Sequence, residues 1–262
     1  MRIVVCVKQV PDTTEVKIDP VKNTLIRDGV PSIVNPFDEC AVEAALRLRE
    51  QYGGHVTVLT MGPPQAETAL RKCLAMGADE AILISDRAFA GADTLATSYT
   101  LARAITKIGA VDIILCGKMA IDGDTAQVGP GIAEHLGLPQ TTYVQKIREV
   151  YDDHIVVERA CEGGYEIIRT ELPALLAVDK AIGEPRYPSV KGSVRALAMP
   201  VRTWTAADVG AETEKTGLNG SPTQVMQIFT PEVALQSEML TAASDDALCD
   251  LLLEKLIAAK AV

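Results

Sequence analysis

The sequence has few of the features that mark metal-binding, membrane or secreted proteins. It holds three histidines, and its six cysteines are scattered singly, with no C-x-x-C pair. This spacing supplies no zinc ligand set and is typical of buried thiols in a reducing compartment. No stretch approaches the roughly 18 uninterrupted apolar residues that cross a membrane. Met1 leads into an apolar run instead of a signal peptide. We therefore expect a cytoplasmic protein.

Clusters of basic residues are also lacking, because the formal net charge is −10 and no basic run is long enough to reverse it locally. A strongly acidic chain repels phosphate backbones and anionic lipids, so nucleic acid and membrane surfaces are not expected partners. The segment from Lys180 to Arg202 differs, because it contains five basic residues and one acidic residue, Glu184. This local excess of positive charge predicts a docking role.

Aromatic residues make up only 4% of the chain, whereas hydrophobic residues make up 48%. Burial must then come from aliphatic side chains, as in helices packed on a parallel sheet. Strand-like apolar runs cover 2–8, 55–61, 79–84 and 111–116, and helical patterns between them cover 36–52, 64–76 and 93–108. This alternation predicts an α/β fold with a doubly wound, mostly parallel sheet.

Local signals support the helix boundaries. Asn35 can cap the first helix, while Pro36 supplies a fixed φ at its first position. Gly77 and Gly109 stand where the second and third helices should end in a left-handed residue.

Beyond Gly137 the pattern changes. Strand-like segments at 141–150, 154–160 and 165–171, separated by turn sequences, predict antiparallel additions to the sheet, and 174–178 can return to it as a buried strand. Glycines and prolines from 183 to 200 predict an exposed loop. The part of the chain after residue 200 predicts an arm that reaches a partner and ends in an amphipathic helix over 245–260. We therefore expect domains of 1–200 and 201–262.

The turn after the fourth strand has the clearest ligand-binding features. Asp124 and Gln127 have capping-box spacing, which predicts a helix over 125–136. Free amides of its first residues would favour a pyrophosphate. Gly123 would allow close approach, and Asp122 could accept a ribose hydroxyl, although its charge would repel phosphate. The spacing of Asp124 and Gln127 is equally compatible with a helix cap that binds no ligand. Lys118 likewise could contact phosphate or be solvated.

Several catalytic and nucleotide signatures are absent. The chain has no G-x-G-x-x-G after the first strand, no G-x-x-x-x-G-K-[ST] and no G-x-S-x-G. A nicotinamide Rossmann enzyme, a P-loop NTPase and a covalent hydrolase are therefore disfavoured. Cys6 and Cys116 sit at strand ends, where packing is a better interpretation than a nucleophilic role.

Ordered motifs along nearly the whole chain resemble the electron transfer flavoprotein β family. These are VCVKQVPD at 5–12, NPFDECAVEAALRL at 35–48, LAMGAD at 74–79, GKMAIDGDTAQVG at 117–129, VERACEGGYEIIRTELPALLA at 157–177 and EPRYPS at 184–189. The resemblance implies a Rossmann-like, adenine nucleotide-binding β subunit with a C-terminal arm, paired with an α subunit that carries its own flavin.

The resemblance also implies which residues meet the nucleotide. These are Cys6, Asn35, Pro36, Phe37, Asp38, Met61, Gly117, Lys118, Met119, Ala120, Ile121, Asp122, Gly123, Asp124, Thr125, Ala126, Gln127 and Val128.

Some family members hold AMP as a structural ligand, whereas electron-bifurcating members hold a second FAD that takes hydride from NADH. The segments 91–102 and 122–130 resemble the second group, with Thr94 and Thr97 placed to approach a flavin. Gly123 and Val128 depart from the AMP pattern, where an acid and a hydroxyl residue are expected. FAD is therefore the expected ligand, and AMP the alternative.

The segment around 184–192 resembles the family's recognition loop, which anchors in acyl-CoA dehydrogenases, with Val190 at its tip. A solvated loop with one exposed valine is the simpler interpretation. The expected partners are the α subunit, an acyl-CoA dehydrogenase and ferredoxin or flavodoxin. A non-redox adenine-nucleotide sensor on a similar fold remains a further hypothesis.

Overall fold

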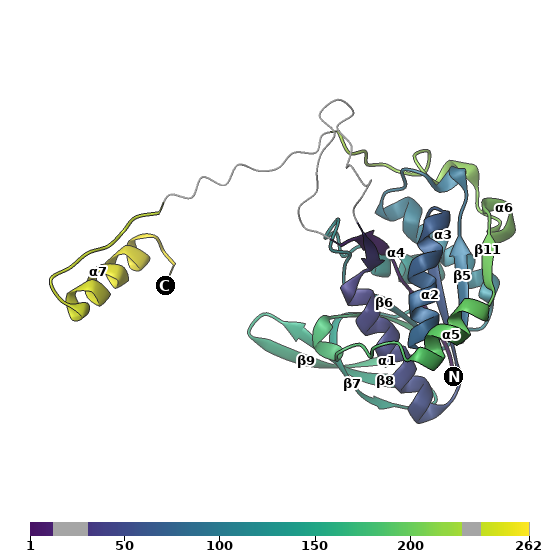
Figure 1. The fold of residues 1–262 in the computed structure, drawn as a ribbon, viewed down its shortest axis with the longest axis horizontal. Coiled ribbons are helices and arrows are strands. Elements are labelled where there is room, and N and C mark those ends of the chain that lie inside the picture. Colours follow the sequence, from purple (N-terminus) through teal and green to yellow (C-terminus); the bar gives the residue numbers. More distant parts are fainter. Residues whose placement is uncertain (13–30, 227–236, 262) are drawn as a thin grey trace. The chain divides into compact units, whose positions relative to one another are not determined.

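The computed structural model describes residues 1–12, 31–226 and 237–261 (Figure 1). The chain divides into two compact units, Met1–Met226 and Gln227–Val262. The expected boundary at 200/201 differs from this division, because residues 201–226 belong with the α/β unit. Residues 227–236 and Val262 of the predicted arm lie outside the described residues.

The larger unit is built on a nine-stranded sheet in the order β11-β5-β4-β1-β6-β10-β7-β8-β9. Pairing is parallel from β11 through β7, and β8 and β9 add antiparallel strands. The α/β fold with a mostly parallel sheet and antiparallel additions is thus confirmed. The strands are β1 Arg2–Cys6, β4 His55–Met61, β5 Glu80–Ile84, β6 Ile113–Gly117, β7 Gln140–Val150, β8 His154–Cys161, β9 Gly164–Glu171, β10 Ala174–Val178 and β11 Val201–Trp204. A separate antiparallel pair joins β2 Gln9–Pro11 to β3 Ser32–Val34.

Helices cover both faces of the sheet (Figure 1). One hydrophobic core lies under α1 Pro36–Tyr52, α2 Glu67–Met76 and α5 Val190–Ala198. The other lies under α3 Thr94–Ile108, α4 Val128–Leu136 and α6 Ala206–Val209. Short 3₁₀ turns are η1 Pro64–Ala66, η2 Arg87–Phe89, η3 Lys180–Ile182 and η4 Thr213–Lys215. The central strands β1, β4, β5, β6 and β10 are buried on both faces, as their apolar runs predict, whereas β9 and β11 are largely exposed.

The winding of the sheet changes direction at β1. From β1 the chain runs outward to β4 and β5, then crosses to β6 on the other side of β1. Cys6 and Cys116, at the carboxyl ends of β1 and β6, are register partners. Open α/β sheets bind ligands at such a switch point, outside the carboxyl ends of the strands. The fold therefore places the candidate site between β1 and β6.

The predicted helix ends are largely confirmed. Pro36 occupies the first turn of α1, and Asp93 caps α3 by accepting from the amides of Leu95 and Ala96. Gly77 and Gly109 end α2 and α3 with φ of 136° and 97°. Both φ values are positive, as expected, although neither residue has the left-handed helical conformation.

The prediction of an exposed loop over 183–200 was wrong for its second half. Ser189 accepts a hydrogen bond from the Gly192 amide and starts α5, and β11 then pairs with β5. Glycine and proline suggested a loop, but a serine cap and one buried alanine, Ala196, hold the helix on α2.

The smaller unit contains α7 Asp245–Ala258, which Ser244 caps. Acidic Asp245 and Asp246 occupy its first turn and Lys255 its last, which complements the helix dipole. None of the residues that the structure describes belongs to a helix long and apolar enough to traverse a bilayer.

Candidate functional site

Asp38 joins three elements at the carboxyl edge of the sheet. Its carboxylate accepts from the backbone amide of Lys8, just after β1, at 2.8 Å and from that of Gly117, at the end of β6, at 2.9 Å. The side chain is buried at the start of α1, and this burial raises the pKa of Asp38 to about 7, against the lowering effect of the two amide donors. Asp38 therefore fixes the two strand ends relative to α1.

Asn35 performs a related task for the loop after β6. It occupies the N-cap position of α1, but its side chain does not cap the helix. The side-chain amide instead donates to the carbonyl of Met119 at 2.9 Å, and its oxygen accepts from the amide of Ile121 at 3.2 Å. The cap prediction was wrong for this side chain because the loop offered it two partners. Asn35 is fully buried, so both hydrogen bonds are protected from water.

The loop before α4 differs from the predicted helix over 125–136. Asp124 and Ala126 have positive φ, 49° and 54°, which a right-handed helix cannot contain, so α4 begins at Val128. Asp124 therefore does not act as the helix cap. A left-handed Ala126 followed by right-handed Gln127 forms a backbone nest, whose successive amides suit an anion. Within the described residues, no backbone carbonyl accepts from the amides of Thr125, Ala126, Gln127 or Val128.

Ion pairs neutralise the charges beside this loop. Lys8 Nζ lies 2.6 Å from a carboxylate oxygen of Asp122, which removes the repulsion that Asp122 alone would exert on a phosphate. Lys118 pairs with Asp179 at 2.6 Å and lies 5.1 Å from the centre of the Phe37 ring. Lys118 is therefore neither solvated nor free. Lys8 and Asp179 were not recognised from the sequence as site residues, although Asp179 directly follows β10 and Lys8 lies two residues after β1.

The remaining candidates line the same edge. Thr94, the first residue of α3, donates to the side-chain oxygen of Gln127 at 2.8 Å and so connects that helix to the loop. Thr97 lies one turn further along α3 and is half-buried. Met61 ends β4, the neighbour of β1. Pro36 is half-buried at the first position of α1.

Two glycines of the loop have opposite surroundings. A Cβ on Gly117 would lie 2.4 Å from Asp38 Oδ1 and 2.6 Å from Phe37 Cβ, so no larger residue fits there. A Cβ on Gly123 would meet no atom of the described residues within 4 Å. Packing within the chain thus requires glycine at 117 but not at 123, where the open space suits the approach of a ligand to the backbone.

The cysteines of the site are packing groups. Burial raises the pKa of Cys6 to about 12 and that of Cys116 well above its ordinary value, so both thiols stay protonated. The expectation of buried thiols fails for Cys161 and Cys249, which are exposed.

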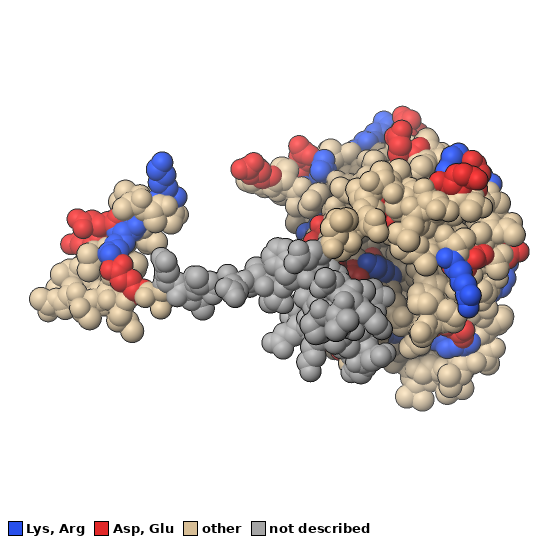
Figure 2. All heavy atoms as spheres, turned by 90° about the horizontal axis from the view of Figure 1, so that it is seen from above, with Lys and Arg blue, Asp and Glu red and all other residues tan. Residues whose placement is uncertain are grey.

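A second surface lies on α5. Its exposed side chains Val190, Val194 and Leu197 recur at helical spacing, and Tyr187 just before the helix is 94% exposed. The predicted excess of positive charge here is largely engaged within the chain. Arg186 pairs with Glu43 and Glu50, and Arg195 donates to carbonyls of Leu74 and Ala78. Figure 2 likewise shows acidic and basic side chains interspersed over the visible face of this unit.

The fold and these motifs agree with comparisons to known proteins. The sequence model described as the electron transfer flavoprotein domain matches residues 22–209. The chain belongs to the electron transfer flavoprotein family. Relatives match over nearly the whole chain, and two of them are named as β subunits.

The electron transfer flavoprotein subunit beta of Clostridium acetobutylicum is 56% identical, over 92% of each chain. The subunit of the same name from Megasphaera elsdenii is 50% identical over the full length of both. The caffeyl-CoA reductase-Etf complex subunit CarD of Acetobacterium woodii is 52% identical over 98% of each. The resemblance to the β-subunit family that the motifs indicated is therefore confirmed.

Proposed function

We propose that the chain is the β subunit of a heterodimeric electron transfer flavoprotein that holds FAD at the β1–β6 edge. Bound FAD would accept a hydride from NADH and pass electrons to ferredoxin or flavodoxin and, through the flavin of the α subunit, to an acyl-CoA dehydrogenase. The observation that carries this proposal is the set of amides from Thr125 to Val128 at the switch point, which donate to no backbone carbonyl of the described residues.

The residues at this edge fit a dinucleotide. The nest at Ala126 and Gln127 offers donors for a diphosphate, and the open space over Gly123 admits it. Asp122, already paired with Lys8, can still accept from a ribose hydroxyl. Asn35 and Asp38 hold the loop and strand ends in place. The protein thereby binds and orients the ligand, and no acid, base or nucleophile is required of its side chains.

Three positions favour FAD over AMP in this proposal. Gly123 leaves space where the resemblance leads us to expect an acid in AMP-binding members, and Val128 offers no hydroxyl for an AMP phosphate. Thr94 is anchored to Gln127, which places a hydroxyl-bearing helix start beside the loop. AMP as a purely structural ligand is the alternative, and a non-redox nucleotide sensor is a third.

The α5 surface is the proposed docking site for the dehydrogenase, with Val190 in contact. Its exposed apolar face supports this assignment, and the Acetobacterium woodii relative is named as a subunit of a caffeyl-CoA reductase-Etf complex. We place the complex in the cytoplasm, which six free thiols support.

Co-expression with an α subunit followed by nucleotide extraction tests the proposal. The purified complex should be yellow and release about two FAD per heterodimer with little AMP. Equal amounts of AMP and FAD would select the scaffold alternative. A complex without flavin would overturn the redox assignment.

A further inference from the structure

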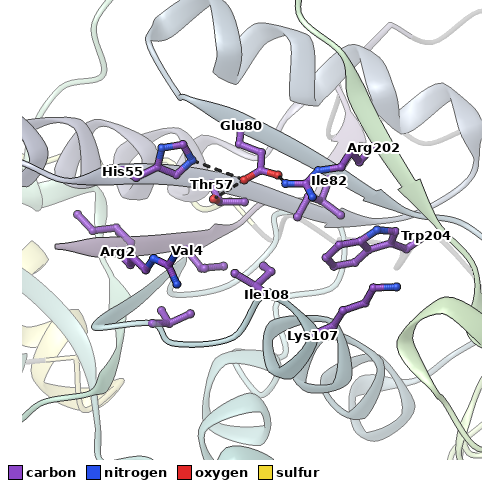
Figure 3. Close-up of a pocket in the computed structure, with 12 residues that line it drawn as sticks. Arg2, Val4, His55, Thr57, Glu80, Ile82, Lys107, Ile108, Arg202 and Trp204 are labelled. Atoms are coloured by element: carbon purple, nitrogen blue, oxygen red, sulfur yellow. Dashed lines mark hydrogen bonds and ion pairs between the residues drawn. The ribbon is translucent and has the colours of Figure 1, made fainter.

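A cavity of about 410 Å³ opens on one face of the sheet toward the amino-terminal ends of its strands, and none of its lining residues belongs to the candidate site (Figure 3). The lining follows from strand alternation, since residues two apart on a strand share a face. Arg2 and Val4 come from β1 and Arg202 and Trp204 from β11, with paired residues of β4 and β5 between them. Helix α3 covers this face and ends at Ile108, so it leaves open the end of the cavity near the amino-terminal ends of the strands.

The lining is unusually positive for this acidic chain. Among the described lining residues, three basic side chains, Arg2, Lys107 and Arg202, stand against one carboxylate, Glu80. Glu80 is already engaged, because Arg202 pairs with it, His55 Nε2 lies 3.5 Å away and Thr57 donates to it at 3.3 Å. The carboxylate therefore neutralises only one of the cations.

Within the described part of the chain, neither the Arg2 guanidinium nor Lys107 Nζ forms an ion pair. Two carboxylates lie nearby: Asp112 accepts from the backbone amide of Arg2 at 2.6 Å, and Asp208 has its pKa lowered mainly by hydrogen bonds with Thr205 and, to a smaller extent, by Lys107. The Arg2 guanidinium donates to the carbonyl of Ala110 at 3.4 Å, and Lys107 Nζ to the carbonyl of Asp208 at 2.6 Å. The last carbonyls of α3 repel an anion, because together they carry about half a negative charge. This is less than the full positive charge of Lys107 in the same turn. The electrostatic balance of the cavity favours an anionic ligand.

Arg2 and Lys107 lie at opposite ends of the cavity, whose middle is apolar. Figure 3 shows Arg2 on the side of β1 and Lys107 below Trp204 on the side of β11, with Ile108 between them. β1 and β11 are three strand positions apart in the sheet, about 14 Å at the usual spacing. Val4 and Ile82 are buried beneath, and Lys107 lies 4.7 Å from the centre of the Trp204 ring. This arrangement suits a ligand with charge at both ends.

We propose that this cavity binds a small organic dianion whose two anionic groups are separated by an apolar chain, of the dicarboxylate class. Arg2 holds one end and Lys107 the other, while Val4, Ile82 and Trp204 contact the middle. The site shares no residue with the nucleotide site, so the inference stands or falls independently of the proposed function.

Trp204 provides the readout because it is the only tryptophan of the chain. The full chain, in complex with its α subunit, is labelled with 5-fluorotryptophan, and the Trp204 resonance is assigned by its loss in Trp204→Phe. Suberate is titrated against octanoate, a monoanion with the same eight carbons. Suberate should shift the resonance saturably and bind about tenfold more tightly than octanoate.

Variants assign the two ends. Arg2→Gln and Lys107→Gln should each reduce suberate affinity about tenfold, to the level of octanoate, and leave octanoate affinity less affected. The double variant Arg87→Gln/Lys191→Gln removes two exposed positive charges elsewhere on the unit and should bind suberate like the wild type. Any one of three results overturns the proposal: no saturable shift at about 10 mM suberate, equal affinity for octanoate, or equal loss in the control variant.

Discussion

The carboxylate of Asp38 accepts a hydrogen bond from the backbone amide of Gly117 at 2.9 Å, and this contact ties the first turn of α1 to the end of β6. Because the same carboxylate also accepts from Lys8 beyond β1, both edges of the switch point depend on one buried group.

Stability should depend on pH through Asp38. Burial raises the pKa of Asp38 to about 7, whereas an unfolded chain releases this proton near pH 4. Between those values the native state binds more protons, so the contribution of this group is fully present below about pH 4 and is lost as pH rises through 7. Asp38→Asn mimics the protonated form but cannot accept from both amides.

The measurement is the melting temperature of the complex from pH 5 to pH 8, for wild type and Asp38→Asn. The variant should be less stable at every pH, and its deficit should shrink as pH rises. Because the wild type and the variant share all other titratable groups, the difference between their melting temperatures removes the pH dependence that those groups cause. Among the described residues, Lys8 lowers the pKa of Asp38, and the charge of Asp38 helps to raise the pKa values of the thiols of Cys6, Cys40, Cys73 and Cys116. A deficit that stays constant with pH would contradict the assigned pKa.

Asn35→Ala should loosen the loop after β6. The substitution leaves the Met119 carbonyl and the Ile121 amide without partners, at a cost of about 1–3 kcal/mol. Bound nucleotide should then dissociate about tenfold faster, measured by retention through gel filtration and by dilution kinetics. Asn219→Ala, at an exposed position of the same unit, is the control and should retain nucleotide normally.

A pair of glycine variants separates folding from ligand contact. Gly117→Ala would place a Cβ against Asp38 and Phe37 and should destabilise the fold by about 1–3 kcal/mol. Gly123→Ala meets open space, so the melting temperature of the nucleotide-free protein should be unchanged while nucleotide content falls. Equal nucleotide content in Gly123→Ala and wild type would argue against close approach at this glycine.

Val190→Asp should impair electron delivery to an acyl-CoA dehydrogenase without loss of flavin. Val190 is 84% exposed at the first position of α5, so folding should tolerate the substitution. Steady-state transfer should show an increase of about tenfold in KM for the dehydrogenase. Val225→Asp, at a valine that is 74% exposed outside α5, supplies the control. Flavin loss with unchanged transfer per remaining flavin would refute the docking role.

The α/β core was predictable because its signals are local. Runs such as His55–Met61 and terminal glycines such as Gly77 and Gly109 define strand and helix ends from neighbouring residues alone, and these were found as expected. The motifs at 35–38 and 117–128 likewise pointed to one edge of the sheet, where Asn35 and Met119 meet across a separation of 84 residues.

The details that could not be predicted depend on distant partners. Capping-box spacing at Asp124 and Gln127 implied a helix, yet positive φ at Asp124 and Ala126 produced a nest, and no pattern in sequence specifies those angles. Lys118 was expected to contact phosphate or to be solvated. It pairs instead with Asp179, which follows a different strand and is distant in sequence. Helix α5 was missed because its stability comes from packing on α2.

Helix α5 is held at both ends, and this constrains any partner that meets it. Before it, Arg186 is bound to two glutamates of α1; along it, Arg71 of α2 donates to the carbonyl of Ala196; after it, β11 is a strand of the sheet. These contacts tie the exposed valines of α5 to the same unit that carries the β1–β6 edge. The tunnelling distance from a bound flavin to a docked protein would then be set by how the whole unit is oriented, and not by flexing of a surface loop.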